Sequence, residues 1–372
     1  YKDRDGKIVK AEDLFPPSII DKGKLTNSMV ASVIVDKIAY TLPLYTQAKR
    51  INLLCGCNAV NVQLLSNAFQ KGADAITPIW EELYHYITTR KAIHGDESRL
   101  LVVNNTAKGK CALGQMWALS YQGNGPKAAY FRFFPGRNKE YGAVIMQECK
   151  GLAFQADGYS VYAALAKEIN KLEAEKIRGE EGDEAAEEFL LQCDKMITDG
   201  ILLVGCLSHA RRKIYQCYEI YKDMKNPELA NKCASLLSLI AELYKVEKQL
   251  RPKYADGSLD ESQFLEERKK LALPIMKELK AKAEAYLPEV KAAPKLEKAL
   301  KYFLNQHSWI INYLECSELT PDNNFQERNF RILAAARRSC FFASSITGAD
   351  AWGKLLTLTQ TAILNNIDPR LY

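Results

Sequence analysis

The stretch that most constrains this chain is a short apolar run at 152–154, which leads directly into Gln155, Asp157 and Gly158. An apolar run of this length predicts a buried strand, and Gly158 permits a tight turn out of it. The pattern therefore places the carboxylate of Asp157 at the end of a strand, where α/β sheets usually hold ligands and metals. An Asp that caps the following helix is the alternative interpretation.

The surrounding segments predict a mixed α/β sheet. Three β-like runs come first, and turn-rich residues at 104–109 and 123–126 separate them into a meander. A helix expected at 139–150 then forms the crossover that lets a fourth strand lie parallel to the first. The expected strands are 100–103, 115–121, 128–134, 151–155 and 201–206.

Two carboxylates fall at corresponding places in this sheet. Asp96 lies on or beside the first strand, and Asp157 ends the fourth. Because these two strands can be adjacent and parallel, the two carboxylates can become neighbours across the sheet.

A third acid, Glu327, begins a segment with a strong basic bias. Between Glu327 and Cys340 the chain carries four arginines and one acid, a composition well suited to phosphate. Helical spacing predicts that Glu327, Arg328 and Arg331 share one face. A surface ion pair between Glu327 and Arg331 is the alternative role for this acid.

Cys206 and His209 precede a basic cluster. Their spacing suits half of a zinc site, but no second half appears in the sequence. In the alternative interpretation, Cys206 is buried while His209 lies near the active centre, where it orients a neighbour or touches DNA. The cluster that follows could equally be a solvated helix face; it consists of Arg211, Arg212 and Lys213.

The N-terminal third is predicted to be helical. A turn at 55–57 precedes Asn58, the expected cap of a helix that reaches Phe69. This arrangement fits a helix-turn-helix DNA reader, and it fits a plain helical hairpin in a small all-α domain equally well.

Two further segments are expected to be insertions. Residues 167–199 hold eleven acidic and five basic side chains, which predicts a peripheral helical hairpin or a flexible loop. Residues 222–314 read as a long helical block, in which Pro252 and later prolines are expected to break the helices.

Composition excludes some classes of protein and permits others. The net charge of +6 permits a nucleic-acid partner without establishing one. Ten scattered cysteines without a Cys-x-x-Cys pair argue against a disulfide framework and favour a reducing cytoplasm. No apolar run approaches the roughly 20 residues that span a bilayer. The chain starts at Tyr1 without an initiator Met, which suggests a piece of a longer protein.

Five motifs occur in one order along the chain, and together they are far more specific than any one alone. In order and spacing they resemble the transposases of the insertion sequence 66 family, from about Leu14 to the last residue. The motifs are HGDES at 94–98, QADGY at 155–159, GCLSHARRK at 205–213, DNNFQERNFR at 322–331 and LNNIDP at 364–369.

The resemblance implies a ribonuclease-H-like core with an Asp-Asp-Glu triad, which motif matching places at Asp96, Asp157 and Glu327. Three converging carboxylates suit Mg²⁺ or Mn²⁺, and two such ions can clamp both oxygens of an in-line phosphodiester displacement. Cys206 and His209 are expected to support this site. Phosphate contacts are expected from Arg211, Arg212, Lys213, Arg328, Arg331, Arg337 and Arg338.

The sequence departs from the family pattern in places. Ser98 stands where Thr is usual, Ile363 replaces a usual Lys, and 336–339 lack the usual Gly and Asn. The acidic segment at 167–199 is longer than the family pattern predicts. None of these changes removes an expected metal ligand. The family usually carries a zinc-binding segment, which in this protein would lie before Tyr1.

We therefore expect a DNA transposase that nicks element ends and joins them to a target. A metal-dependent nuclease of the same fold and a non-catalytic DNA-binding relic are the alternatives. Expected partners are duplex DNA at element ends and target, further copies of the chain, and accessory proteins of the element, without a membrane. The expected segments are an arm at 1–25, a helical DNA-binding domain at 26–91, the first part of the core at 92–221, a helical insertion at 222–318 and the last core helices at 319–372.

Overall fold

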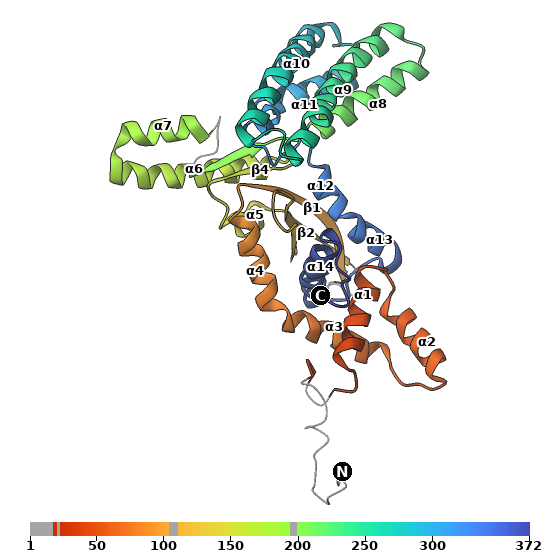
Figure 1. The fold of residues 1–372 in the computed structure, drawn as a ribbon. Helices are drawn as coiled ribbons and strands as arrows, with labels where there is room; N and C mark the ends of the chain where they lie inside the picture. Colours follow the sequence, from red (N-terminus) through yellow and green to blue (C-terminus); the bar gives the residue numbers. More distant parts are fainter. Residues whose placement is uncertain (1–17, 21–22, 104–110, 194–198) are drawn as a thin grey trace, which may run out of the picture. The chain divides into compact units, whose positions relative to one another are not determined.

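A computed structural model describes residues 18–20, 23–103, 111–193 and 199–372 (Figure 1). Most of the expected arm and the expected turn at 104–109 lie outside these residues. The chain forms two compact units. The first contains Tyr1–Glu82, Leu100–Ala112 and Ile332–Tyr372, and the second contains Leu83–Arg99 and Leu113–Arg331. The domain bounds expected from the sequence stay predictions.

A five-stranded sheet organises the structure, in the order β3-β2-β1-β4-β5. β2 and β3 are antiparallel, whereas β1 with β4 and β4 with β5 are parallel. The mixed α/β sheet predicted from the sequence is thus confirmed. The strands are β1 Ala92–Val103, β2 Cys111–Tyr121, β3 Ala128–Phe134, β4 Leu152–Gln155 and β5 Ile201–Val204.

The first strand begins at Ala92, well before the expected residue 100. The prediction missed this start because His94 and Asp96 interrupt the apolar pattern on which it relied. These polar residues nevertheless sit within the strand, whose residues 92–94 form a ladder with β4. The first strand therefore carries the acidic motif within it.

Helix α5 (Lys139–Met146) forms the crossover to β4 and ends earlier than the expected residue 150. After it, Gly151 adopts a φ of 63°, a conformation that favours glycine. The Gly151 N–H donates to the Gly200 carbonyl at 2.7 Å. The starts of β4 and β5 are thereby tied together.

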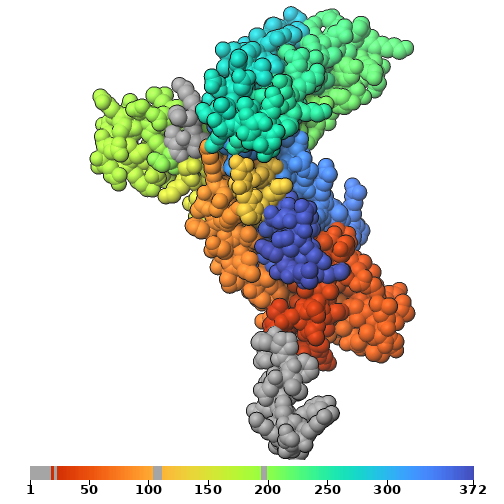
Figure 2. All heavy atoms as spheres, in the orientation of Figure 1, coloured from red at the N-terminus to blue at the C-terminus, as the bar shows by residue number. Residues whose placement is uncertain are grey.

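The acidic insertion is a helical hairpin of α6 (Ser160–Glu181) and α7 (Asp183–Cys193), which projects from the rest of its unit (Figures 1 and 2). A small core of Ala174, Ala186, Phe189 and Cys193 holds the two helices together. The base of the hairpin is not peripheral as expected. Buried Asn170 accepts from the Ile201 N–H at 2.6 Å and donates to the Ile201 carbonyl at 2.9 Å.

A helical block of α8 to α11 forms a large part of the second unit. Its helices pack around one apolar core that continues onto the sheet at Ala153 and Leu202. The expected break at Pro252 is wrong, because α9 continues through it to Ala255. α10 likewise continues through Pro274. Packing on both sides outweighs the lost N–H at Pro274, where neighbouring Ala272 and Met276 are buried. The helices are α8 Leu207–Asp223, α9 Pro227–Ala255, α10 Glu261–Glu289 and α11 Pro294–Ile310.

The first unit is helical. Its core contains Val30, Ala48, Val60 and Leu65, and α14 packs on α1 and α3. No described helix of either unit is long and apolar enough to cross a membrane. The helices are α1 Asn27–Ile38, α2 Leu44–Cys55, α3 Val62–Ala75 and α14 Ile346–Leu364, while α4 Thr77–Thr88 and α13 Arg331–Cys340 cross the unit boundaries.

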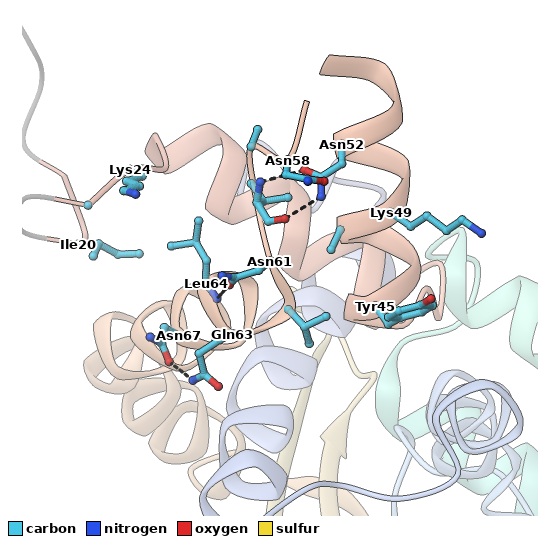
Figure 3. A pocket seen from close by; sticks show the side chains of 15 residues that line it. Ile20, Lys24, Tyr45, Lys49, Asn52, Asn58, Asn61, Gln63, Leu64 and Asn67 are labelled. Atoms are coloured by element: carbon cyan, nitrogen blue, oxygen red, sulfur yellow. Dashed lines mark hydrogen bonds between the residues drawn. The ribbon is translucent and has the colours of Figure 1, made fainter. Parts of the chain in front are cut away.

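The expected cap at Asn58 is wrong, because α3 begins only after Asn61, whose side chain accepts from the Leu64 N–H at 2.8 Å (Figure 3). Asn52 fixes the intervening turn by bonding both the N–H and the carbonyl of Val60. A cavity of about 840 Å³ lies over this turn. The helix-turn-helix function of α2 and α3 stays a prediction.

A buried guanidinium ties the helical block to the chain that precedes α12 (Asn324–Asn329). Arg268, which is fully buried, donates to the carbonyls of Tyr313 at 2.7 Å, Cys316 at 2.8 Å and Leu319 at 3.1 Å. Glu247 lies 3.7 Å from the same guanidinium. The Tyr313 and Cys316 carbonyls therefore depend on this side chain, while Arg251 also binds the Leu319 carbonyl and Glu247.

We expect Arg268→Leu to destabilise the protein strongly. The change leaves the Tyr313 and Cys316 carbonyls buried without this donor and takes from Glu247 one of its two guanidinium partners, and breaking a buried ion pair costs about 3–5 kcal/mol. At about 2–4 °C per kcal/mol, the midpoint of thermal unfolding should fall by roughly 6–20 °C in scanning calorimetry. Lys277→Leu, at an exposed position on the same helix, is the control and should shift the midpoint by less than about 2 °C. Equal midpoints for Arg268→Leu and the unmodified protein would contradict this role.

Candidate active site

The pairing of β1 with β4 positions the first two predicted carboxylates. Ala92, Ile93 and His94 lie opposite Ala153, Phe154 and Gln155, respectively. Asp96 lies two residues beyond His94 in β1, and Asp157 lies two residues beyond Gln155, just past the end of β4. Both carboxylates therefore follow the last paired residues of two adjacent strands, and the expectation that they share one face of the sheet stays a prediction.

Gly95 lies between His94 and Asp96 in β1, and its position leaves no room for a side chain. A Cβ atom there would lie 2.3 Å from the ring of Phe154, so no larger residue fits without moving that ring. Phe154 in turn packs on Tyr162 of α6, with ring centroids 5.4 Å apart. The glycine in the first motif is thus a packing requirement of the sheet.

Asp96 lies among negative charges. Burial raises the pKa of this carboxyl well above its usual range, and the charges of Glu97, Asp157 and Glu327 raise it further. Its Oδ1 accepts from the Glu97 N–H at 2.8 Å. The structure therefore brings all three predicted acids into electrostatic contact at Asp96.

Asp157 closes the turn after β4. Its Oδ1 accepts from the Tyr159 N–H at 2.9 Å, while α6 begins at Ser160 without a side-chain cap. Asp157 therefore does not cap α6. Its side chain instead stabilises the turn that leads into this helix.

Glu327 lies in the first turn of α12 and faces two residues of α8. The Nη2 of Arg212 is 3.2 Å from its Oε2, and the Nδ1 of His209 is 3.7 Å from its Oε1. The expected shared face with Arg331 is wrong, because the helix is interrupted between α12 and α13. The partners of Glu327 thus come from the motif that contains Cys206 and His209.

His209 and Cys206 lie beside Glu327, as the sequence suggested for supporting residues. Burial lowers the pKa of His209, whereas the charges of Glu327 and Asp157 oppose that shift. Burial raises the pKa of the Cys206 thiol to about 12. One ligand atom from each of Cys206, His209 and Glu327 lies within 4.8 Å of the others, so this trio is a second set of side chains that could hold a metal ion.

Asn323 joins three of the motifs. Its side chain bonds His94 Nδ1 at 2.9 Å and donates to the Gly95 carbonyl at 2.9 Å, and its backbone N–H donates to Cys206 Sγ at 3.2 Å. Burial lowers the pKa of His94 to about 4. The neutral ring donates to Asn323 and accepts from the Gln122 amide, 3.0 Å from its Nε2.

Three functional residues were missed from the sequence. Asn323 lies inside a quoted motif, and its position before Glu327 was the available signal. Gln155 donates to the carbonyls of Thr320 at 2.8 Å and Gly205 at 3.3 Å. Buried Glu97 accepts from the Tyr162 hydroxyl at 2.6 Å and pairs with Arg137, and burial raises its pKa.

The basic residues predicted to touch DNA belong to three helices, α8, α12 and α13, and to both units. Arg212 is engaged by Glu327, and Lys213 lies 4.7 Å from the ring of Tyr302. Arg328 lines a groove of about 550 Å³ beside Tyr244. The others are distributed over α8 and α13: Arg211 lies 5.8 Å from the Tyr215 ring, Arg331 begins α13, and Arg337 and Arg338 belong to the first unit.

Comparison with known proteins places the chain in a family. A family model described as "Transposase IS66 family" matches residues 22–351. The uncharacterized protein y4jD of Sinorhizobium fredii is 24% identical over 360 residues, which cover 95% of this chain and 62% of the relative. The uncharacterized protein y4qI of the same organism is 26% identical over 374 aligned positions, covering 99% and 61%. The chain thus spans about three fifths of the length of these relatives. The family match covers most of the chain and confirms the family expected from its motifs: the chain belongs to the IS66 family of transposases.

Proposed function

We propose that this chain carries the catalytic part of a DNA transposase, which cleaves phosphodiester bonds at the ends of an insertion sequence and joins them to a target. The observation that supports this most directly is that Asp96 and Asp157 each follow the last β1–β4 pair by two residues, and that the charge of Asp157 acts on Asp96. The charge of Glu327 acts on the same carboxyl, although this residue comes from a distant part of the chain.

Asp96, Asp157 and Glu327 are the proposed catalytic residues and metal ligands. Their oxygen-rich donor set suits Mg²⁺ or Mn²⁺, and transposases of this type generally use a divalent metal. The Oε1 of Glu327 is buried and has no hydrogen-bond partner among the described residues, as expected of an atom reserved for a ligand. Bound metal supplies charge stabilisation for the attacking and leaving oxygens of the displacement.

The residues around the triad hold Glu327 in place. Arg212 binds one carboxylate oxygen, and His209 faces the other. We assign His209 as a positioning residue for Glu327, and Cys206 as the acceptor that fixes the Asn323 backbone. Asn323 then ties α12 to the strand that carries Asp96.

A ribonuclease-H-like core is the fold we assign to the sheet. The family implies it, and the order β3-β2-β1-β4-β5 with an antiparallel β2–β3 pair and parallel β1, β4 and β5 supports it. In this arrangement the carboxyl ends of β4 and β5 lie at one edge, beside Asp157 and Cys206.

Duplex DNA is the proposed substrate, with positively charged residues of α8, α12 and α13 as phosphate contacts. Assembly of several copies on the DNA, accessory proteins of the element and a cytoplasmic location complete the proposal. The phosphate contacts comprise Arg211, Arg212, Lys213, Arg328, Arg331, Arg337 and Arg338.

We expect Glu327→Gln to separate binding from chemistry. The amide keeps the size of the side chain but removes the charge that a divalent ion requires. Mg²⁺-dependent cleavage of an element-end duplex should fall by orders of magnitude, because metal-held charge stabilisation is worth several kcal/mol. Binding of the same duplex should remain, since it depends on Lys and Arg contacts.

The matched control for this experiment is Glu315→Gln, because Glu315 pairs with Lys269 at 2.7 Å and lies in another helix. This variant should cleave like the unmodified chain. Full cleavage by Glu327→Gln would remove Glu327 from the proposed triad.

We expect Arg328→Gln with Arg331→Gln to weaken duplex binding and to flatten its dependence on salt. If both residues contact phosphate, the slope of log K against log salt concentration should decrease by about 1.8, at about 0.9 per contact. Titration of the duplex at several salt concentrations measures this slope. Lys176→Gln with Arg178→Gln, on the α6–α7 hairpin, removes the same charge and should leave the slope unchanged. An unchanged slope in the first variant would place the duplex elsewhere.

A further inference from the structure

A basic groove runs between α8 and α11, within the second unit. It has a volume of about 860 Å³, and its lining carries four lysines and one carboxylate, that of Glu219. α8 comes from the core part of the sequence, whereas α11 closes the helical insertion. The groove lysines are Lys213, Lys295, Lys298 and Lys301.

Two of these lysines are available to a ligand. Lys295 and Lys298 are exposed, and neither has an ion-pair partner within 4.0 Å among the described residues. Lys301 is paired with Glu297 at 2.6 Å, and Lys213 lies over the Tyr302 ring. The free positive charge of the groove therefore concentrates on the α11 side.

Aromatic rings accompany these charges. Tyr215 also lines the groove and is 44% exposed, so its ring is open to a ligand. Its ring lies 6.3 Å from that of Tyr218 and 5.8 Å from the Arg211 guanidinium. Lysines that track a backbone and aromatic faces on which bases stack are the two elements of single-strand binding sites.

One end of the groove meets the proposed catalytic site. A Cβ atom at Gly158 would lie 2.7 Å from the Tyr302 hydroxyl, so this groove residue contacts the turn that follows Asp157. Burial raises the pKa of Tyr302 to about 12, and the nearby charge of Asp157 contributes to that shift. A chain lying in the groove would therefore have its end beside Asp157.

The exposed ring of Tyr215 favours a single strand over a duplex. α8 and α11 pack on each other, so the groove is a furrow on the surface of this helix pair. In a duplex the faces of the bases are stacked on one another and cannot lie on Tyr215, whereas a single strand exposes them for stacking. A single strand can therefore place its phosphates toward the lysines and a base on Tyr215.

We propose that the α8–α11 groove binds a single DNA strand that leads to or from Asp157, with Lys295, Lys298 and Tyr215 as its principal contacts. This inference rests on the proposed function and extends it, because it gives the helical insertion a direct part in holding the substrate. All three contacts lie outside the motifs that carry the family resemblance: Lys295 and Lys298 belong to the insertion, and Tyr215 follows the basic cluster of α8.

The test measures how tightly the full chain binds a single-stranded DNA oligonucleotide of mixed sequence that carries a fluorescein label. Fluorescence anisotropy reports the binding, and EDTA is present so that no cleavage occurs. Lys295→Gln with Lys298→Gln should reduce affinity at least tenfold at low salt. It should also lower the slope of log K against log salt by about 1.4, at about 0.7 for each phosphate contact on a single strand.

Lys253→Gln with Lys277→Gln is the matched control, because both lysines are exposed on α9 and α10 and lie outside the groove lining. This variant loses the same charge and should bind the oligonucleotide like the unmodified chain. Equal slopes for the groove variant and this control would overturn the inference.

Tyr215 provides a second, independent test. Tyr215→Ala should weaken single-strand binding by roughly tenfold, because stacking on one ring is lost. Tyr215→Phe keeps the ring and should bind normally. Because Tyr215 lies at the surface, both variants should unfold at the same temperature as the unmodified chain. Equal affinity of the Ala and Phe variants would exclude stacking at this ring and overturn the inference.

A duplex of the same sequence tests whether the groove binds a single strand in preference to double-stranded DNA. The groove variants should bind it within about twofold of the unmodified chain, because the stacked bases of a duplex cannot lie on Tyr215 and the duplex is expected to bind elsewhere. An equal loss for duplex and single strand would overturn the assignment to a single strand.

Failure of this inference can be told from failure of the proposed function. If the unmodified chain cleaves element-end DNA with Mg²⁺ while Lys295→Gln with Lys298→Gln leaves the salt slope unchanged, only the groove is wrongly assigned. If no DNA is cleaved, the proposed function fails, and the binding data still decide whether the groove holds a strand.

Discussion

Parallel pairing of β1 with β4 in a single register is the constraint on which the candidate site depends. A slip of one residue would turn every side chain of one strand to the other face and would change the positions of Asp96 and Asp157, which follow the last pair of the ladder. All four residues of β4 are buried, so apolar burial holds this strand in the sheet without selecting its register. The close contact of Gly95 with Phe154 selects the register. The acidic residues themselves oppose this arrangement through their mutual repulsion, and the packing of the sheet overcomes it.

Glu327 lies far along the chain and outside the sheet, so strand pairing does not position it. Buried polar contacts position its segment instead. Asn323 binds the strand that carries Asp96, and Gln155 binds the carbonyl of Thr320. Arg268 holds the preceding segment from the side of the helical block. Each of these groups is buried, so an unmade hydrogen bond would cost about 1–3 kcal/mol. The long helical insertion therefore helps to position the third acid rather than merely separating it from the first two.

The sequence predicted those elements whose residues form a clear local pattern, and it missed those that depend on contacts with distant segments. β3 was predicted at its observed bounds because six of its seven residues form an apolar and aromatic run. The start of β1 was missed where polar site residues replace that run, and α9 was expected to break at Pro252 because packing cannot be read from local sequence. Motif order indicated the three acids. Asn323 and Glu97 were missed because a polar residue that is buried by distant segments looks the same in sequence as one in solvent.

The α6–α7 hairpin has a practical consequence for spectroscopy. Beyond Asn170 its helices pack mainly on each other. Gly182 turns between them at a φ of 100°, and a Cβ atom added there would meet no heavy atom within 4 Å. A fluorescent reporter inserted after Gly182 would be carried on a lever that is anchored to β5 through Asn170. Its distance to a dye on a DNA end would report docking of that DNA, without a label on any residue of the proposed site.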